Sequence, residues 1–167
     1  MEARKLSESG SEPFQFSLRI RHPSIDPADL SRTLNVEPEY AYAAGTPRRG
    51  SKGRSAPVYP ETYWLGVLKP SAAALADLAF SSDDLARIAH RQVTAIRRNL
   101  SWSLAMTVGR VLNAHGDLLR RLRAEGGEVT LLVTVFGAEV DTFSLTPETS
   151  RVLGDLGVAV EFEIGTE

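Results

Sequence analysis

An alternating segment that runs directly into a capped helix start constrains the fold more than any other part of the chain. In FQFSLRIR, residues 14–21, apolar and polar side chains alternate, which is typical of a half-buried strand. Asp26 then stands where an N-cap accepts a backbone N–H, and Pro27 occupies the first helical position. The sequence therefore predicts a strand followed by a short helix that ends near Leu34.

The same succession recurs in the last part of the chain. Thr146 and Pro147 repeat the cap and the proline, and they predict a helix to about Leu156. GVAVEFEI, residues 157–164, predicts a strand with Glu161 and Glu163 on its outer side. Its inward side chains are expected to be Val158, Val160, Phe162 and Ile164.

Three further segments read as strands. ETYWLGVLK, residues 61–69, is apolar and aromatic, and EVTLLVTVF, residues 128–136, is apolar on both faces, which is typical of a central strand. VDTFSLT, residues 140–146, is predicted to return as the hairpin partner of 128–136. Apolar residues at three- and four-residue steps predict a helical segment over residues 71–125.

Together these elements predict an α+β fold. We expect a ferredoxin-like or related mixed sheet, mainly antiparallel, of about five strands, with helices on one face and a helical insert between the two halves. The 167 residues suit one domain over 13–167, preceded by a disordered polar tail over 1–12. Residues 36–60, rich in proline and glycine, are expected to form a long basic loop.

Composition narrows the function classes. The chain has no cysteine, which excludes disulfides, thiolate metal sites and a cysteine nucleophile. His22, His90 and His115 share no metal-ligand spacing and are expected on the surface or on a helix face. We therefore expect no metal, no cofactor and no catalytic residue. No signal peptide or membrane span is recognisable, so we expect a cytoplasmic protein without membrane contact.

Charge is distributed unevenly along the chain. Residues 85–123 hold eight arginines and one aspartate, a net charge of +7, whereas residues 124–167 hold nine acids and one arginine, a net charge of −8. The two blocks either lie together and neutralise each other, or leave a basic surface that attracts an anionic partner.

The stretch GTPRRGSKGRS, residues 45–55, combines glycines and cations without an acid. It is not a phosphate-binding P-loop, because Ser51 stands where that motif needs its lysine. Basic groups among aromatic rings can hold single-stranded nucleic acid or a protein partner, although a solvated loop with anchored aromatics fits the same pattern. The candidate contact residues are Arg48, Arg49, Lys52, Arg54, Tyr42 and Tyr59.

The order of these motifs resembles bacterial domain-of-unknown-function family 4279. The matching pattern begins with a strand, followed by the motif D-P-x-x-[IL]-[ST]-x-x-L-x-[IV]-x-P, which spans a helix and the residues just after it. A glycine-bearing loop and a final strand–helix–strand complete the pattern. It covers most of residues 14–164. The stretch around residues 70–105 is longer here. The resemblance implies a small α+β domain and transfers no catalytic residue. The matching residues are Asp26, Pro27, Leu30, Ser31, Leu34, Val36, Pro38 and Gly45.

Three functions remain open at this point. The first is a non-catalytic module that binds an unknown protein partner, such as an immunity-like protein that neutralises its target, and the charge asymmetry favours it. The second is RNA or single-stranded DNA binding through the basic loop and the arginine-rich helix. The third is an enzyme with a site built from loops.

Overall fold

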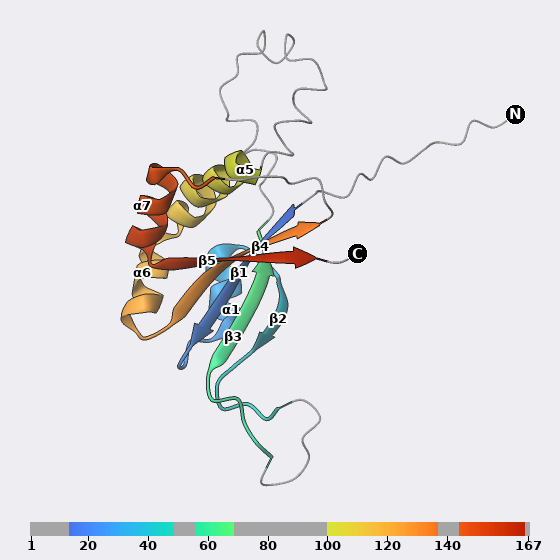
Figure 1. Ribbon diagram of the computed structural model, residues 1–167. Coiled ribbons are helices and arrows are strands. Elements are labelled where there is room, and N and C mark those ends of the chain that lie inside the picture. The colour runs from blue at the N-terminus through green and yellow to red at the C-terminus, as the bar shows by residue number, and fades with distance from the viewer. Residues whose placement is uncertain (1–13, 49–55, 69–99, 137–143, 166–167) are drawn as a thin grey trace, which may run out of the picture.

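The structure is a computed structural model that describes residues 14–48, 56–68, 100–136 and 144–165 (Figure 1). Helices and strands combine in an α+β arrangement, as the sequence predicts. In chain order the elements are β1 (Phe14–His22), α1 (Pro27–Leu34), β2 (Pro38–Tyr42), β3 (Thr62–Val67), α5 (Leu100–Met106), the π-helical η1 (Thr107–Leu112), α6 (Gly116–Ala124), β4 (Glu128–Phe136), α7 (Pro147–Leu156) and β5 (Val158–Gly165).

The strands form one five-stranded sheet in the order β2-β3-β1-β4-β5. The first four strands pair antiparallel, whereas β5 runs parallel to β4. Parallel neighbours need a crossover connection, and α7 lies in that connection. The mixed, mainly antiparallel sheet is thus confirmed, and the narrower assignment to a ferredoxin-like fold stays a prediction.

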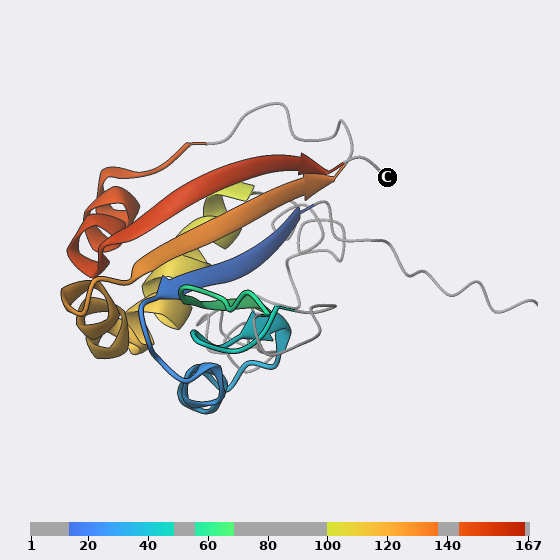
Figure 2. The same cartoon turned by 90° about the horizontal axis from the view of Figure 1, so that it is seen from below.

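The two faces of the sheet differ in what covers them. In Figure 2, α1 and the helix formed by α5 and η1 lie on the same side of the sheet. Five residues of β1, β3 and β4 that point to this side have no exposed surface, and they are Leu18, Ile20, Trp64, Leu131 and Val133. No described helix covers the opposite side, which we call the open face. It carries Arg19 and Arg21 of β1, Tyr42 and Tyr63 of β2 and β3, Glu128 of β4 and Glu161 of β5.

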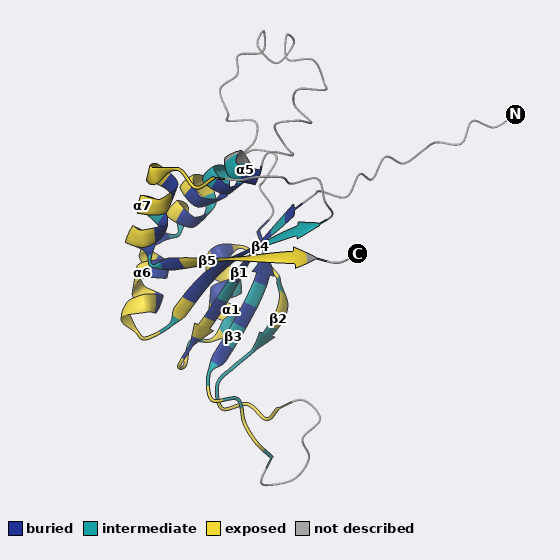
Figure 3. Cartoon of the chain, viewed as in Figure 1, coloured by how far each residue is buried: buried dark blue, intermediate teal, exposed yellow. Residues whose placement is uncertain are grey.

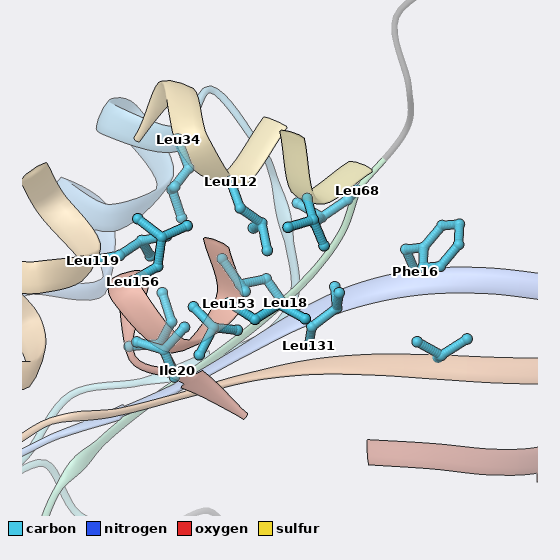
Figure 4. Packing of buried hydrophobic residues seen from close by; sticks show 14 of the residues in the cluster. Phe16, Leu18, Ile20, Leu34, Leu68, Leu112, Leu119, Leu131, Leu153 and Leu156 are labelled. Carbon is cyan, nitrogen blue, oxygen red and sulfur yellow. The ribbon is translucent and has the colours of Figure 1, made fainter. Parts of the chain in front are cut away.

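Helix side chains complete a single hydrophobic core. In Figure 4, Leu34, Leu119 and Leu156 gather around Leu18 and Ile20 of the central strand. Burying a leucine contributes roughly 1.5–3 kcal/mol, so this layer supplies much of the stability that holds the sheet rigid. Figure 3 shows the resulting contrast between buried strand centres and exposed outer helix surfaces.

Both predicted cap-and-proline motifs begin helices. The Asp26 carboxylate accepts a hydrogen bond from the Ala28 amide at 2.8 Å, and the Thr146 hydroxyl accepts one from the Thr149 amide at 3.2 Å. The α1 helix ends at Asn35 in a left-handed conformation, and α7 ends at Gly157 with φ +68°. These local signals needed no tertiary context, which explains why the sequence located both helices.

The prediction that β5 buries its whole inner side is only half right. Val158 is buried, but the exposed fraction of Ile164 reaches 86% and that of Phe162 reaches 39%. The reason is geometric, because the far end of β5 extends past the described helices (Figure 1). This end of the sheet therefore presents apolar side chains to its surroundings.

Two further predictions are wrong. Residues 36–60 are not loop throughout, because Pro38–Tyr42 pairs with β3 as an edge strand. Residues 140–146 cannot be the hairpin partner of β4, because β1 and β5 occupy both of its edges. In that segment residues 144–146 form no strand, and 140–143 lie outside the described residues.

Other predictions are tested only in part. The predicted tail, 1–12, and residues 69–99 of the helical segment lie outside the described residues. Residues 100–124 are helical apart from a turn, and the hydrogen-bond pattern becomes π-helical around Gly109. No helix in the described ranges is long and apolar enough to span a lipid bilayer.

Candidate functional site

The β2–β3 hairpin continues beyond the sheet as a two-stranded arm, formed by residues 43–48 and 56–61 (Figure 1). The Gly45 amide donates to the Tyr59 carbonyl at 2.8 Å, and the Tyr59 amide donates to the Thr46 carbonyl at 3.0 Å. Farther out, the Arg48 amide donates to the Pro57 carbonyl at 2.9 Å. The described ends of the predicted basic loop are therefore held in a ladder of backbone hydrogen bonds.

Thr62 fixes the base of this arm to the domain. Its side chain has no exposed surface, and its hydroxyl accepts a hydrogen bond from the Ala44 amide at 3.1 Å. The same hydroxyl donates to the Ile25 carbonyl at 2.7 Å, just before α1. One buried side chain thus connects the arm to the start of α1, and the arm leaves the sheet in a defined direction.

Four tyrosines gather where the arm meets the open face, and we call Tyr40, Tyr42, Tyr59 and Tyr63 the tyrosine cluster. Tyr42 stacks on Tyr59 with ring centroids 3.7 Å apart, and on Tyr63 with centroids 5.4 Å apart. Tyr40 meets Tyr42 and Tyr63 edge-on, at 5.8 Å from each. Such ring pairs contribute about 0.5–1.5 kcal/mol beyond their area burial, so the cluster is a preorganised surface.

Strand register explains why these rings share one face. Tyr42 and Tyr63 are direct cross-strand partners, and Arg21 is the partner of Tyr63 on the next strand. Side chains alternate along a strand, so Trp64 points the other way, into the core. There its indole N–H donates to the Ser31 hydroxyl at 3.0 Å. Adjacent aromatic residues of β3 therefore have different roles, one at the surface and one in the core.

Charged groups border the cluster at both ends. The Arg48 guanidinium lies 5.9 Å from the centroid of the Tyr59 ring, within the range of a cation–π contact. At the other end, the Arg21 guanidinium donates twice to Glu61, at 2.5 and 2.9 Å, and once to Glu128 at 3.5 Å. The cluster is thus bordered by one arginine near a ring and by a second arginine paired with acids.

The pKa values follow from these contacts. Burial raises the pKa of the Tyr42 phenol above its usual range, and the nearby Glu61 carboxylate adds to the increase. The hydrogen bonds and the charge of Glu61 raise the pKa of the Arg21 guanidinium. At neutral pH Tyr42 therefore presents a neutral phenol close to the charged Arg21 guanidinium.

The structure brings together half of the predicted contact residues. The Tyr59 ring stacks on Tyr42 and also lies beside the Arg48 guanidinium. Arg49, Lys52 and Arg54 lie outside the described residues. The sequence analysis did not select Tyr63, Arg21 or Glu61 for the site. Tyr63 and Arg21 occupy outward positions of alternating strands, which was an available signal, but their pairing depends on a register that no local pattern gives.

Among the described residues, the two charge blocks meet at the end of α6, where the Arg121 guanidinium lies 4.0 Å from the Glu125 carboxylate. Glu161 of β5 pairs with Arg19, and Glu128 of β4 pairs with Arg21, so these acids are paired with arginines of β1. Arginines of α6 pair instead within their own helix and its end, as in Arg120 with Asp117 at 3.1 Å. On the open face, the described residues of the sheet therefore combine Arg19 and Arg21 with the acids Glu128, Glu161 and Glu163.

His22 differs from the prediction of a surface or helix-face residue. It ends β1 with only 3% of its surface exposed, and its Nδ1 accepts from the amides of Ser24 and Ile25 at 3.1 and 2.9 Å. Its Nε2 lies 3.2 Å from a carboxylate oxygen of Glu125, although the geometry is not that of a hydrogen bond. The chain folds back at Gly127 onto the ring, and this contact buries it.

Comparison with known proteins does not assign the chain to a family. No family model matches the chain, no curated protein matches it, and no solved structure matches it. The resemblance to family 4279 therefore stays a prediction. Within the described residues, no group of three or more histidine, aspartate or glutamate side chains is placed to hold a metal ion.

Proposed function

We propose that the chain is a non-catalytic module that binds a protein partner through the tyrosine cluster. One observation carries the proposal: four tyrosines lie together on the open face, at the base of an arm fixed by Thr62. Tyrosine and arginine are over-represented among residues that dominate binding energy at protein interfaces. The candidate site has this composition, because it combines the tyrosine cluster with Arg48 and Arg21.

Rigidity supports the same function. Rings that already stack on one another lose little side-chain entropy when a partner covers them, and ordering such groups costs about 0.5–1.5 kcal/mol for each mobile side chain. Tyr42 is held by Tyr59 on one side and by Tyr63 on the other. The cluster can therefore contact a partner with its geometry already set.

The geometry favours a protein partner over a nucleic acid. Bases bind by stacking on open ring faces, but Tyr59 and Tyr63 lie nearly parallel to Tyr42, at 17° and 16°, and cover its faces. Glu61 and Glu128 next to the cluster would repel phosphates. Among the described residues, the second candidate, nucleic-acid binding, draws its support from Arg48 beside the Tyr59 ring.

The deciding experiment is capture of partners from a lysate of the source organism by the tagged full chain, with and without nuclease. The test variant is Tyr40→Ser, which changes an exposed ring with 39% of its surface accessible. The matched control is Arg151→Ser, an exposed residue of α7 on the helical side. Thermal unfolding of both variants verifies that they fold.

We expect one protein in stoichiometric amount that survives nuclease, remains with Arg151→Ser and is reduced several-fold with Tyr40→Ser. Hot-spot truncations cost 2 kcal/mol or more, about thirty-fold in affinity, so a clear loss should follow. Equal capture by both variants would remove the tyrosine cluster from the interface. Partners that disappear on nuclease digestion would establish the nucleic-acid alternative instead.

A further inference from the structure

The two edges of the sheet are protected to different degrees. β2 has five residues, begins with Pro38, which has no amide N–H, and shifts register between Pro38 and Tyr40. Short length, proline and a bulge are features by which natural proteins block an edge strand against further pairing. β5 has eight residues, no proline and no lysine, and it pairs with β4 without interruption from Val129 to Phe136. Within the described residues it has a strand on one side only.

The side chains of β5 form two distinct rows. On the open face, Glu161 and Glu163 are exposed, and Glu161 is paired with Arg19. Glu163 forms no ion pair with another described residue. On the helical side, exposure increases along the strand, from buried Val158 to Ile164 at 86%. Acidic side chains on one face therefore alternate with apolar side chains on the other.

We propose that the β5 edge binds an extended segment of a partner protein in which basic and aliphatic residues alternate. The segment would add a sixth strand to the sheet, with backbone hydrogen bonds supplying affinity and alternate side chains supplying specificity. Lysine or arginine on the open face would lie beside Glu163 and Glu161, and aliphatic residues on the other face would cover Ile164. Opposite charges at neighbouring positions of paired strands are favourable.

Charge also disfavours a second copy of this chain in the two antiparallel registers that pair β5 along most of its length. Two β5 strands paired antiparallel about Phe162 would place Glu161 of each opposite Glu163 of the other. Pairing about Glu161 would place the two Glu161 side chains opposite each other. Like charges directly opposite destabilise a strand pair. The edge is therefore selective for a strand of opposite charge.

This surface is distinct from the tyrosine cluster, which lies at the other edge of the sheet beside β2. The proposal does not rest on the proposed function, and the two can fail separately. A protein partner could use both edges, but the β5 edge is tested with a defined peptide and needs no known partner.

The test measures binding of eight-residue peptides to the full chain by fluorescence anisotropy. The first peptide alternates lysine and valine, the second alternates glutamate and valine, and the third is the first with N-methyl groups on alternate backbone nitrogens. N-methylation leaves the charge unchanged but removes the backbone donors that strand addition needs. We expect the lysine peptide to bind at least five-fold more tightly than either of the other two.

Charge reversal then locates the site. Glu163→Lys should weaken the lysine peptide about five-fold and strengthen the glutamate peptide by a similar factor, since exposed ion pairs each contribute a modest free energy. Glu37→Lys, the same change at an exposed residue next to the opposite edge, should leave both affinities unchanged. Amide hydrogen exchange with the lysine peptide should slow in β5 and not in β2.

Three results would overturn the proposal. The methylated peptide could bind as well as its parent, which would mean charge attraction without strand pairing. The two reversal variants could behave alike, which would place binding elsewhere. The chain could form a dimer through β5 that Glu163→Lys leaves intact, which would make a second copy the occupant.

Discussion

The ring of Tyr42, in an edge strand, stacks at 3.7 Å on the ring of Tyr59, in the arm beyond the sheet. The contact joins the regular part of the hairpin to the arm that projects from it. This contact therefore affects both the stability of the domain and the geometry of the candidate site. Substitutions of these few residues can test both.

The first prediction concerns this ring pair. Replacing Tyr42 and Tyr59 by leucine, singly and together, should reveal a coupling energy of about 1 kcal/mol in the free energy of unfolding, the usual size for an aromatic pair. Urea unfolding of the four proteins completes the cycle. Additive single effects would show that the stacking does not contribute to stability.

The second prediction concerns alkaline pH. Because the folded state raises the pKa of Tyr42, its neutral form is favoured by folding, and this contribution is complete below the ordinary tyrosine pKa of about 10. It should be lost as the pH rises through the higher folded pKa. The difference in phenolate absorbance between the wild type and Tyr42→Phe gives the titration of this one group. A midpoint at or below 10 would contradict the prediction.

The third prediction concerns Thr62. Thr62→Val keeps the shape but removes the hydroxyl that bonds the Ala44 amide and the Ile25 carbonyl. Leaving these groups without their partner should lower the free energy of unfolding by about 1–3 kcal/mol. Thr62→Ser keeps the hydroxyl and is the matched control, expected to lose less. Equal losses in the two variants would mean that packing, not hydrogen bonding, makes Thr62 important.

The fourth prediction concerns the backbone beneath Trp64. A Cβ at Gly66 would lie 2.5 Å from the Trp64 ring and 2.9 Å from Val36. Gly66→Ala should therefore destabilise the fold by about 1–3 kcal/mol through overpacking. At Gly154 of α7 a Cβ meets nothing within 4 Å, so Gly154→Ala should leave stability unchanged or raise it by up to about 1 kcal/mol. Thermal or urea unfolding of both variants compares them directly.

Elements whose signals are local were predictable from the sequence. Asp26 with Pro27, and Thr146 with Pro147, start helices by hydrogen bonds within a few residues. The alternation of β1 survives in the structure for the same reason, since its two faces need different side chains. Such signals give the elements and the fold class, but they do not state which strand lies beside which.

Features that depend on strand pairing were missed. PEYAY has no apolar alternation of its own and becomes a strand only because β3 pairs with it. The end of the chain's first strand is buried because the turn at Gly127 closes over His22, more than a hundred positions later in the sequence. The tyrosine cluster likewise requires the register that sets Tyr42 opposite Tyr63.

The order of the strands has a consequence for synthesis on the ribosome. β1 is made first, yet it lies in the middle of the sheet, between β3 and β4. Both of its hydrogen-bonding edges and its apolar row, from Phe14 to Ile20, stay without strand partners until β3 and then β4 have left the exit tunnel. The nascent chain therefore carries β1 with at least one unpaired, aggregation-prone edge until β4 has been made.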